Sequence, residues 1–371
     1  METVTRVLLA GLLLVYFTTQ AGEVSPEQAA KLQARIMNAN LPLQNRVRAL
    51  KKLHADQIVN GKINRSFCVW DPLGRNGPIY ATVNDQKLRS LHYGLALDIR
   101  AYPDEEQLIT DLKSGVCDAA LIRGNRTYEF NRYVATLEAP GAVPDVQHFR
   151  ILSQVIASPK MAGKMEQGDY VVAGVAYLGD SYFVRHPKPL QSLAALGQQK
   201  LGVIRDERSL VEVANRLSAN AVKLGAVAAA GEFVAGGLDV ILAPAVIYQA
   251  LIAGQLNGPV RILDMPQSLS TIQLIGRQEK FPTGLAQILR EDFLFKFDTY
   301  VGRVKAEMNT VPADYWQPVP ESEQQRHRSQ LQSLRLSLRK QGLYDGDMLT
   351  LMRKVRCKLA PQAAECTAVV E

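Results

Sequence analysis

The stretch FCVWDPLGRNG, residues 67–77, decides the fold that the sequence predicts. Its first four residues are apolar and favour strands, and polar residues flank them, which is typical of a short buried strand. Gly74 and Gly77 then permit backbone conformations that other residues resist, and Pro78 suits the first turn of a helix. The stretch is therefore predicted to be a strand that leads through a charged turn into a helix.

The charged turn is the first candidate for a ligand site. In open α/β sheets, ligands lie at the carboxyl ends of strands, where helix N-termini present free N–H groups. Asp71, Arg75 and Asn76 occupy this position in the sequence. In the alternative interpretation, Asp71 only caps the helix predicted over 79–91 and Arg75 is a solvated loop charge.

A second turn of the same kind follows a third strand. Strands are predicted over 94–102 and 116–122, and a helix over 104–115 joins them. This alternation predicts a parallel sheet with right-handed crossovers, in which the two turns meet at one edge. The residues that leave the third strand are Arg123, Asn125 and Arg126. Arginine side chains at such an edge suit a carboxylate or a phosphate, which the guanidinium can bind through two hydrogen bonds.

The second half of the chain repeats the pattern. A strand predicted over 170–177 leads through a polar turn at 178–182 into a second series of elements. This series has a strand over 200–204, a helix over 209–224 and a strand over 237–242. The candidate ligand contacts that it adds are Tyr177, Asp180, Tyr182 and Arg205.

The predicted fold is α/β, a two-lobed periplasmic-binding-protein-like fold (type II-like) with C-terminal helices. Residues 22–176 form most of the first lobe, and residues 177–264 form the second lobe. Residues 265–371 return to the first lobe and add long C-terminal helices. Other long helices are predicted over 25–53, 149–168 and 282–308.

The N-terminus has the pattern of a secretory signal peptide. Arg6 precedes an apolar run over 7–17, and small residues follow, so residues 1–21 are predicted to be removed by cleavage after Ala21. The apolar run is shorter than the roughly 20 residues that a membrane-spanning helix needs. The predicted localisation is the periplasm, without stable membrane insertion.

The chain contains four cysteines, an even number that predicts two disulfides in an exported protein. A Cys68–Cys117 bridge would join two neighbouring strands, and a Cys357–Cys366 bridge would close a small loop; other pairings remain open. The five histidines are scattered, without the spacing of a metal site. No metal and no cofactor are expected.

The net charge is +7, and the whole excess lies between residues 324 and 358. The remainder of the chain is nearly neutral, so no nucleic-acid partner is expected. The basic C-terminal helices present either a solvated face or a docking face for a membrane surface or a protein partner.

Almost the whole mature chain resembles the solute-binding proteins related to the extracytoplasmic binding subunits of TRAP transporters. The matching stretches are 68–80, 111–131, 232–248, 281–293 and 342–359. The resemblance implies export to the periplasm, capture of a small solute in the cleft between two lobes, and delivery to membrane transporter subunits. The sequence departs from the family at one position, where Lys200 and Leu201 match but Gly202 replaces the arginine that holds a substrate carboxylate.

These observations predict a binding protein and not an enzyme, since the chain has none of the common nucleophile, phosphate-loop, dinucleotide or zinc-protease motifs. If its arginines face the cleft, the solute is anionic; alternatively, Asp71 and Asp180 hold an amine. A rival hypothesis is an envelope interaction protein without a ligand, linked at most indirectly to drug efflux, that uses the basic C-terminal helices.

Overall fold

A computed structural model describes residues 24–186, 193–204, 207–244, 247, 251–252, 254–256, 260–367 and 370–371. The predicted signal peptide lies outside the described residues. Among those described, no helix is long and apolar enough to span a membrane, and no group of histidine, cysteine or acidic residues could hold a metal ion.

Strands from both lobes join in one sheet, with the order β1-β2-β4-β11-β6-β9-β7-β8. The strands of lobe I are β1 (Ile58–Val59), β2 (Lys62–Trp70), β3 (Leu95–Tyr102), β4 (Ala119–Arg123) and β5 (Glu166–Gln167). The strands of lobe II are β7 (Lys200–Ile204), β8 (Asn220–Leu224), β9 (Val240–Pro244) and β10 (Arg261–Asp264). β12 (Trp316–Pro318) pairs with β10, although residues 265–371 were predicted to return to lobe I. In each lobe three neighbouring strands are parallel, β3-β2-β4 in one and β8-β7-β9 in the other. The predicted α/β two-lobed fold is confirmed.

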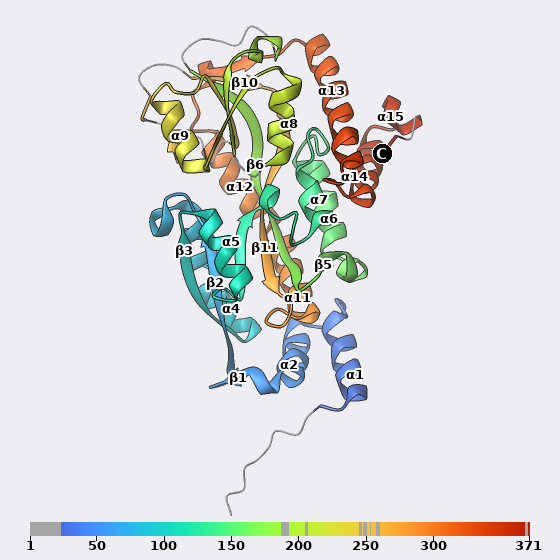
Figure 1. Ribbon diagram of the computed structural model, residues 1–371. Helices are drawn as coiled ribbons and strands as arrows, with labels where there is room; N and C mark the ends of the chain where they lie inside the picture. The colour runs from blue at the N-terminus through green and yellow to red at the C-terminus, as the bar shows by residue number, and fades with distance from the viewer. Residues whose placement is uncertain are drawn as a thin grey trace, which may run out of the picture.

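Two long antiparallel strands connect the lobes. β6 (Tyr170–Arg185) and β11 (Ser268–Arg277) pair along their length, and in Figure 1 they run through the middle of the molecule. β11 also pairs with β4 of lobe I, whereas the end of β6 pairs with β9 of lobe II. Because β4 is antiparallel to β11 and parallel to β2, the carboxyl ends of β2 and β4 point toward lobe II.

Helices cover both lobes (Figure 1). Lobe I and its N-terminal extension carry α1 (Pro26–Met37), α2 (Leu43–Leu53), α3 (Pro78–Asn84), α4 (Lys87–Ser90), α5 (Glu105–Ser114), α6 (Arg132–Ala135) and α7 (Val146–Ile156). Lobe II carries α8 (Arg208–Arg216) and α9 (Ala226–Val234). The C-terminal part contains α11 (Thr283–Phe295), α12 (Phe297–Met308), α13 (Glu321–Lys340), α14 (Gly346–Leu359) and α15 (Ala364–Thr367).

The predicted turn at 178–182 is wrong, because β6 continues through it. Tyr177 pairs with Thr271 and Gly179 pairs with Ser270, so Leu178 is an extra residue in the ladder. Gly179 has a φ of 117°, which favours glycine. The polar, glycine-containing run is therefore a β-bulge, and such bulges bend a strand without ending it. This bulge lies where β6 passes from one lobe to the other.

Several predicted helices are shorter than expected. Pro42 and Pro159 lie inside the predicted helices 25–53 and 149–168, and α1, α2 and α7 avoid them because proline removes an internal hydrogen bond. The helix predicted over 209–224 ends at Arg216, and its second part is β8, which pairs with β7. The long region 282–308 is broken at Lys296, not at Gly302.

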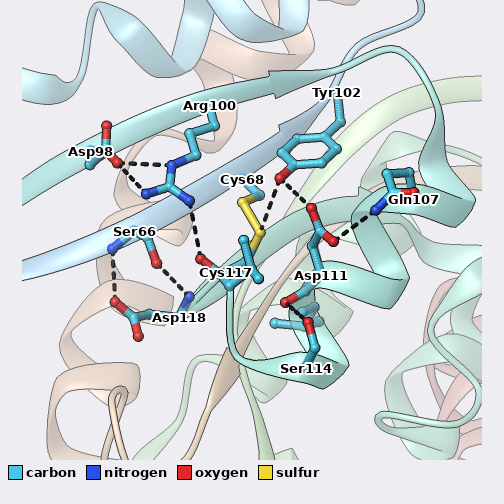
Figure 2. The surroundings of a disulfide bond; sticks show 12 residues. Ser66, Cys68, Asp98, Arg100, Tyr102, Gln107, Asp111, Ser114, Cys117 and Asp118 are labelled. Carbon is cyan, nitrogen blue, oxygen red and sulfur yellow. Dashed lines mark hydrogen bonds and ion pairs between the residues drawn. A yellow bond between two sulfur atoms is a disulfide. The ribbon is translucent and has the colours of Figure 1, made fainter.

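Two disulfides are present, with the pairing that the sequence favoured. Cys68 on β2 joins Cys117, just before β4, and both side chains are fully buried. Figure 2 shows that hydrogen bonds surround this bridge: Ser66 and Asp118 exchange two backbone-to-side-chain bonds of 2.8 Å each. The bridge therefore fastens the two strands whose carboxyl ends carry the predicted site.

Part of the basic C-terminal region forms ion pairs with the acidic residues of the tail. Arg335 on α13 and Arg356 on α14 are buried, and both form ion pairs of 2.6 Å with the side chain of Glu371. Arg356 pairs also with Glu365, and Arg353 is 9% exposed. Arg335 and Arg356 thus hold the tail against α13 and α14, so the rival hypothesis would have to use exposed cations of these helices such as Arg339.

Candidate functional site

A cavity of about 90 Å³ lies between the lobes, and we call it the cleft. Its lobe I wall comes from the ends of β2 and β4 and from the segment after α6, with Trp70, Arg123, Asn125 and Glu138. The connecting strands contribute Ser181, Ser270 and Thr271, and lobe II contributes Gly202, Ile204, Glu207 and Ile241. One wall is therefore polar and charged, and the lobe II wall is mainly apolar apart from Glu207.

Arg123 bridges the two lobes across the cleft. Its guanidinium binds Glu105 of α5 with an Nη2–Oε2 distance of 2.6 Å and Glu207 of lobe II with an Nη1–Oε1 distance of 2.7 Å. It also lies over the Trp70 ring, 5.0 Å from the ring centroid. Burial alone would lower the pKa of Arg123, but the charges of Glu105 and Glu207 raise it well above its usual value. Arg123 is therefore a largely buried, permanently charged group, 13% exposed, that already holds two carboxylates.

Glu207 and Asn125 complete the polar wall. Burial raises the pKa of Glu207, while the charge of Arg123 opposes that rise. The Oδ1 atom of Asn125 is buried and has no hydrogen-bond partner among the described residues. Because an unsatisfied buried acceptor is costly, a donor group on a bound molecule would stabilise this wall.

Glu138 is a second carboxyl group at the cleft. It accepts hydrogen bonds from the Thr271 backbone N–H at 2.5 Å and from the Thr271 hydroxyl at 2.7 Å. Burial raises its pKa from an ordinary 4.5 to about 8, against the lowering effect of these hydrogen bonds. Glu138 is therefore mainly protonated at neutral pH and contributes no full charge to the cleft.

The raised pKa of Glu138 predicts a pH effect on stability. Between pH 4.5 and about 8 the folded protein holds a proton on Glu138 that the unfolded chain releases, so a rise in pH favours unfolding. We expect the wild type to lose several kcal/mol of unfolding free energy over this window relative to Glu138→Gln, which keeps the acceptor for Thr271. Urea denaturation at a series of pH values measures this, with Glu129→Gln, an exposed carboxyl, as the control. Parallel curves for wild type and Glu138→Gln would contradict it.

Comparison with known families matches residues 87–371 to the solute-binding protein AdeT 1/2 family. The chain belongs to this family. It is 28% identical over 299 residues to the solute-binding protein AdeT1 of Acinetobacter baumannii, covering 80% of this chain and 98% of that protein. It is 22% identical over 229 residues to AdeT2 of the same organism, covering 61% and 95%. The prediction of a binding protein that is not an enzyme is confirmed by this membership.

Solved structures of TRAP periplasmic solute-binding proteins share the fold of this AdeT 1/2 family member. The protein from Desulfovibrio salexigens with bound orotic acid has a TM-score of 0.67 at 12% identity, covering 80% of this chain and 99% of that chain. The protein from Bradyrhizobium with galacturonate has a TM-score of 0.65 at 18% identity, covering 78% and 99%. The protein from Desulfovibrio desulfuricans with sn-glycerol-3-phosphate has a TM-score of 0.65 at 14% identity, covering 79% and 97%.

The first predicted turn builds the fold more than it lines the cleft. The Asp71 carboxylate is fully buried and accepts hydrogen bonds of 2.8 to 2.9 Å from the N–H groups of Leu73, Ile79 and Tyr80. It therefore caps α3, as the alternative interpretation held. Arg75 and Asn76 are exposed in the 3-10 turn before α3, and neither lines the cleft.

The remaining predicted residues fall at different places. Arg123 and Asn125 line the cleft together, and the charge of Arg126 acts on Glu207 from the adjoining turn. On β6, the Tyr177 hydroxyl donates to Asp180 at 3.0 Å, and burial raises the pKa of Asp180 to about 6. Tyr182 packs edge-on against Trp316, and Arg205 lies outside the described residues.

Three carboxyl groups at this site were not predicted. Glu105 begins α5, Glu138 follows α6, and Glu207 lies between β7 and α8. Glu207 follows the carboxyl end of a parallel strand, so the rule that selected Arg123 also applies to it. Gly202 lines the cleft, and a Cβ atom there would lie 2.6 Å from Cδ1 of Leu238. This packing leaves the lobe II wall without a cation at residue 202.

Proposed function

We propose that this protein is exported to the periplasm, captures a small polar, anionic solute in the cleft, and delivers it to membrane transporter subunits. The ion pair between Arg123 of lobe I and Glu207 of lobe II carries this proposal. A bound anionic solute would supply a carboxylate that binds Arg123 and holds the two lobes closed. In the structure, Glu207 occupies that position.

The proposed mechanism is an exchange of carboxylates during closure. The solute enters when the lobes separate, its carboxylate replaces that of Glu207 on Arg123, and the lobes close over it. A hydroxyl or amide donor on the solute satisfies the Oδ1 atom of Asn125. The structural neighbours named above contain orotic acid, galacturonate and sn-glycerol-3-phosphate, each an acid with further polar groups, which supports this solute class.

Export and delivery rest on the family and on the sequence. The N-terminal pattern of a cleaved signal, the two disulfides and membership of a solute-binding family all favour a periplasmic protein. A solute-binding protein in the periplasm needs a membrane partner to complete transport. Transporter subunits are the partner that the TRAP-like fold favours.

The experiment is thermal unfolding of the mature protein, from Gly22 onward with its disulfides formed, against a panel of solutes. The panel contains hydroxy acids, sugar acids, amino acids, phosphorylated metabolites, polyamines and aminoglycosides. A ligand present at about 100 times its dissociation constant adds roughly 2.7 kcal/mol of stability, which raises the unfolding midpoint clearly. Stabilisation by acids supports the proposal, and stabilisation by amines alone contradicts it.

The substitution Glu207→Gln tests the exchange of carboxylates. Removing the competing charge frees Arg123, so we expect an acidic solute to bind about tenfold more tightly, a change of about 1.4 kcal/mol. Titration calorimetry measures the affinity, and Glu212→Gln on α8 of the same lobe is the matched control.

A second candidate is an amine as the solute. Glu138 and Glu207 both line the cleft, and Arg123 is already paired, so the cleft also offers carboxyl oxygens to a cation. An amine would lose its partner in Glu207→Gln and bind more weakly. The direction of the change in affinity therefore separates the two solute classes.

A further inference from the structure

A second, larger cavity of about 860 Å³ is lined mainly by lobe I, and we call it the lobe I cavity. It lies between the helices α3 and α4 on one side and α11 and α12 on the other, against one face of the lobe I sheet. The side chains of that face are Phe67, Leu97, Leu121, Ala176, Ile272 and Leu274. Small-molecule sites in proteins commonly have volumes of roughly 300–1,000 Å³, mainly apolar walls and a few polar groups. The lobe I cavity matches this description.

One cluster of charged groups lines the lobe I cavity at the α4 and α11 helices. The carboxylate of Asp292 binds the Arg89 guanidinium at 2.6 Å, the Lys296 ammonium at 2.9 Å and the Tyr93 hydroxyl at 2.6 Å. Burial alone would raise the pKa of Asp292, but these hydrogen bonds lower it below its usual value. Two cations therefore share a single ionised carboxylate, so this cluster carries a surplus positive charge, while Asp71, Asp85, Arg303 and Glu307 also line the cavity.

Large apolar side chains stand in solvent beside this cluster. Phe295 is 78% exposed and Leu88 is 77% exposed, and each is the chain neighbour of a cation of the cluster. The Arg89 guanidinium lies 5.4 Å from the centroid of the Phe295 ring. The charged end of the cavity is thus bordered by apolar surface, a combination that suits a molecule with both an apolar and an anionic part.

We infer that the lobe I cavity is a second binding site, for an amphiphile with a single apolar chain and a carboxylate head, such as a fatty acid. The chain lies against the apolar face of the sheet, where leaving water is favourable in proportion to the buried area. The carboxylate lies at Arg89 and Lys296 and balances the surplus charge. This site goes beyond the proposed function, because a small polar solute would lose its hydration against such walls without gaining hydrogen bonds.

The lobe I cavity and the cleft can be tested apart, because among the described residues they share only Leu178 and Ile247 in their linings. The mature protein is first stripped of copurified lipid on a hydrophobic resin. The fluorescent apolar probe N-phenyl-1-naphthylamine is then titrated into it and displaced with dodecanoate, dodecanol or dodecylamine. We expect probe binding, and displacement in the order dodecanoate, dodecanol, dodecylamine.

Two substitutions locate the site. Leu97→Trp fills part of the cavity and is expected to weaken probe binding about tenfold, whereas Leu97→Ala enlarges the cavity and keeps binding. Val116→Trp, at an exposed position outside the cavity, is the control. Lys296→Met is expected to weaken the binding of dodecanoate about tenfold relative to that of dodecanol. Both affinities are measured in the same variant, so a smaller fraction of folded protein does not change their ratio.

Absence of probe binding to the stripped wild type would overturn the inference. Equal probe affinity in Leu97→Trp and wild type, with unfolding midpoints that show both to be folded, would also overturn it. Dodecylamine that displaces the probe better than dodecanoate would overturn the assignment of a carboxylate head. Glu207→Gln should leave all displacement curves unchanged, so failure of this site and failure of the cleft as a solute site give different results.

Discussion

Replacing Arg123 by methionine is expected to lower the free energy of unfolding by about 3 to 5 kcal/mol and to remove stabilisation by acidic solutes. The guanidinium pairs with Glu105 and Glu207, whose side chains are 6% and 7% exposed. Removing one partner of a buried ion pair leaves an uncompensated charge, and this loss is typically of that size. Urea denaturation measures the free energy, and the solute panel measures binding.

The pH dependence and a double variant test the reason for this loss. Without Arg123, the main cause that lowers the pKa of Glu207 is gone and only the weaker effect of Arg126 remains, so that pKa rises further above its unfolded value. The loss in Arg123→Met should therefore shrink as the pH falls and Glu207 takes up a proton. Adding Glu207→Gln should restore part of the stability. Strict additivity of the two substitutions would argue against a charged interlobe contact.

Removing the Cys68–Cys117 disulfide is expected to cost about 4 kcal/mol of unfolding free energy. The bridge closes a loop with a sequence separation of 49, and in the chain-entropy account the stabilisation grows with the loop. The bridge also holds β2 beside β4, and the ends of both strands line the cleft. Its removal therefore loosens this wall of the cleft as well. Urea denaturation of the double variant Cys68→Ala and Cys117→Ala measures this loss of unfolding free energy.

The second disulfide is the matched control for this prediction. Cys357 and Cys366 are separated by only 9 residues, so their loss should cost less, about 3 kcal/mol. It should also leave solute binding intact, because the bridge lies in the tail and not at the cleft. A larger loss of stability on removing the tail bridge would contradict the loop-length argument.

The parallel strands of lobe I could be predicted because their signals are local. The apolar residues 67–70 and the alternation of strand and helix gave β2, β3, α5 and β4 with shifts of a few residues. The disulfide pairing followed from this topology, since neighbouring parallel strands brought Cys68 and Cys117 together. Pro78 and Asp71 also begin α3 as their residue types predict.

The elements that were missed depend on partners far away in the sequence. β8 has only five residues, and pairing with β7 decides its conformation against the helical pattern around it. Likewise, β6 continues through Gly179 because β11 pairs with it before and after the bulge, and β9 pairs with the part that follows. A local pattern of polar residues and glycine cannot distinguish such a bulge from a turn.

The residues of the site also divide into those that a local sequence pattern predicts and those that depend on distant contacts. Arg123 and Asn125 were found because they follow the carboxyl end of a predicted strand. Glu105 and Glu138 were missed because an acidic residue at the start of a helix or in a loop is usually solvated, and only the packed fold makes these two buried. The contact between Glu207 and Arg123 spans 84 residues and joins the two lobes, and no local sequence pattern predicts such a contact.

Titration calorimetry with one acidic solute and its neutral amide tests the central claim most directly. The solute is the acid that stabilises the wild type best in the thermal panel. We expect the acid to bind at one site per chain and the amide to bind about 100-fold more weakly, since a charged hydrogen-bonded pair with Arg123 contributes about 1.5 to 3 kcal/mol. Equal affinities for the acid and the amide would contradict the proposal that Arg123 captures an anionic solute.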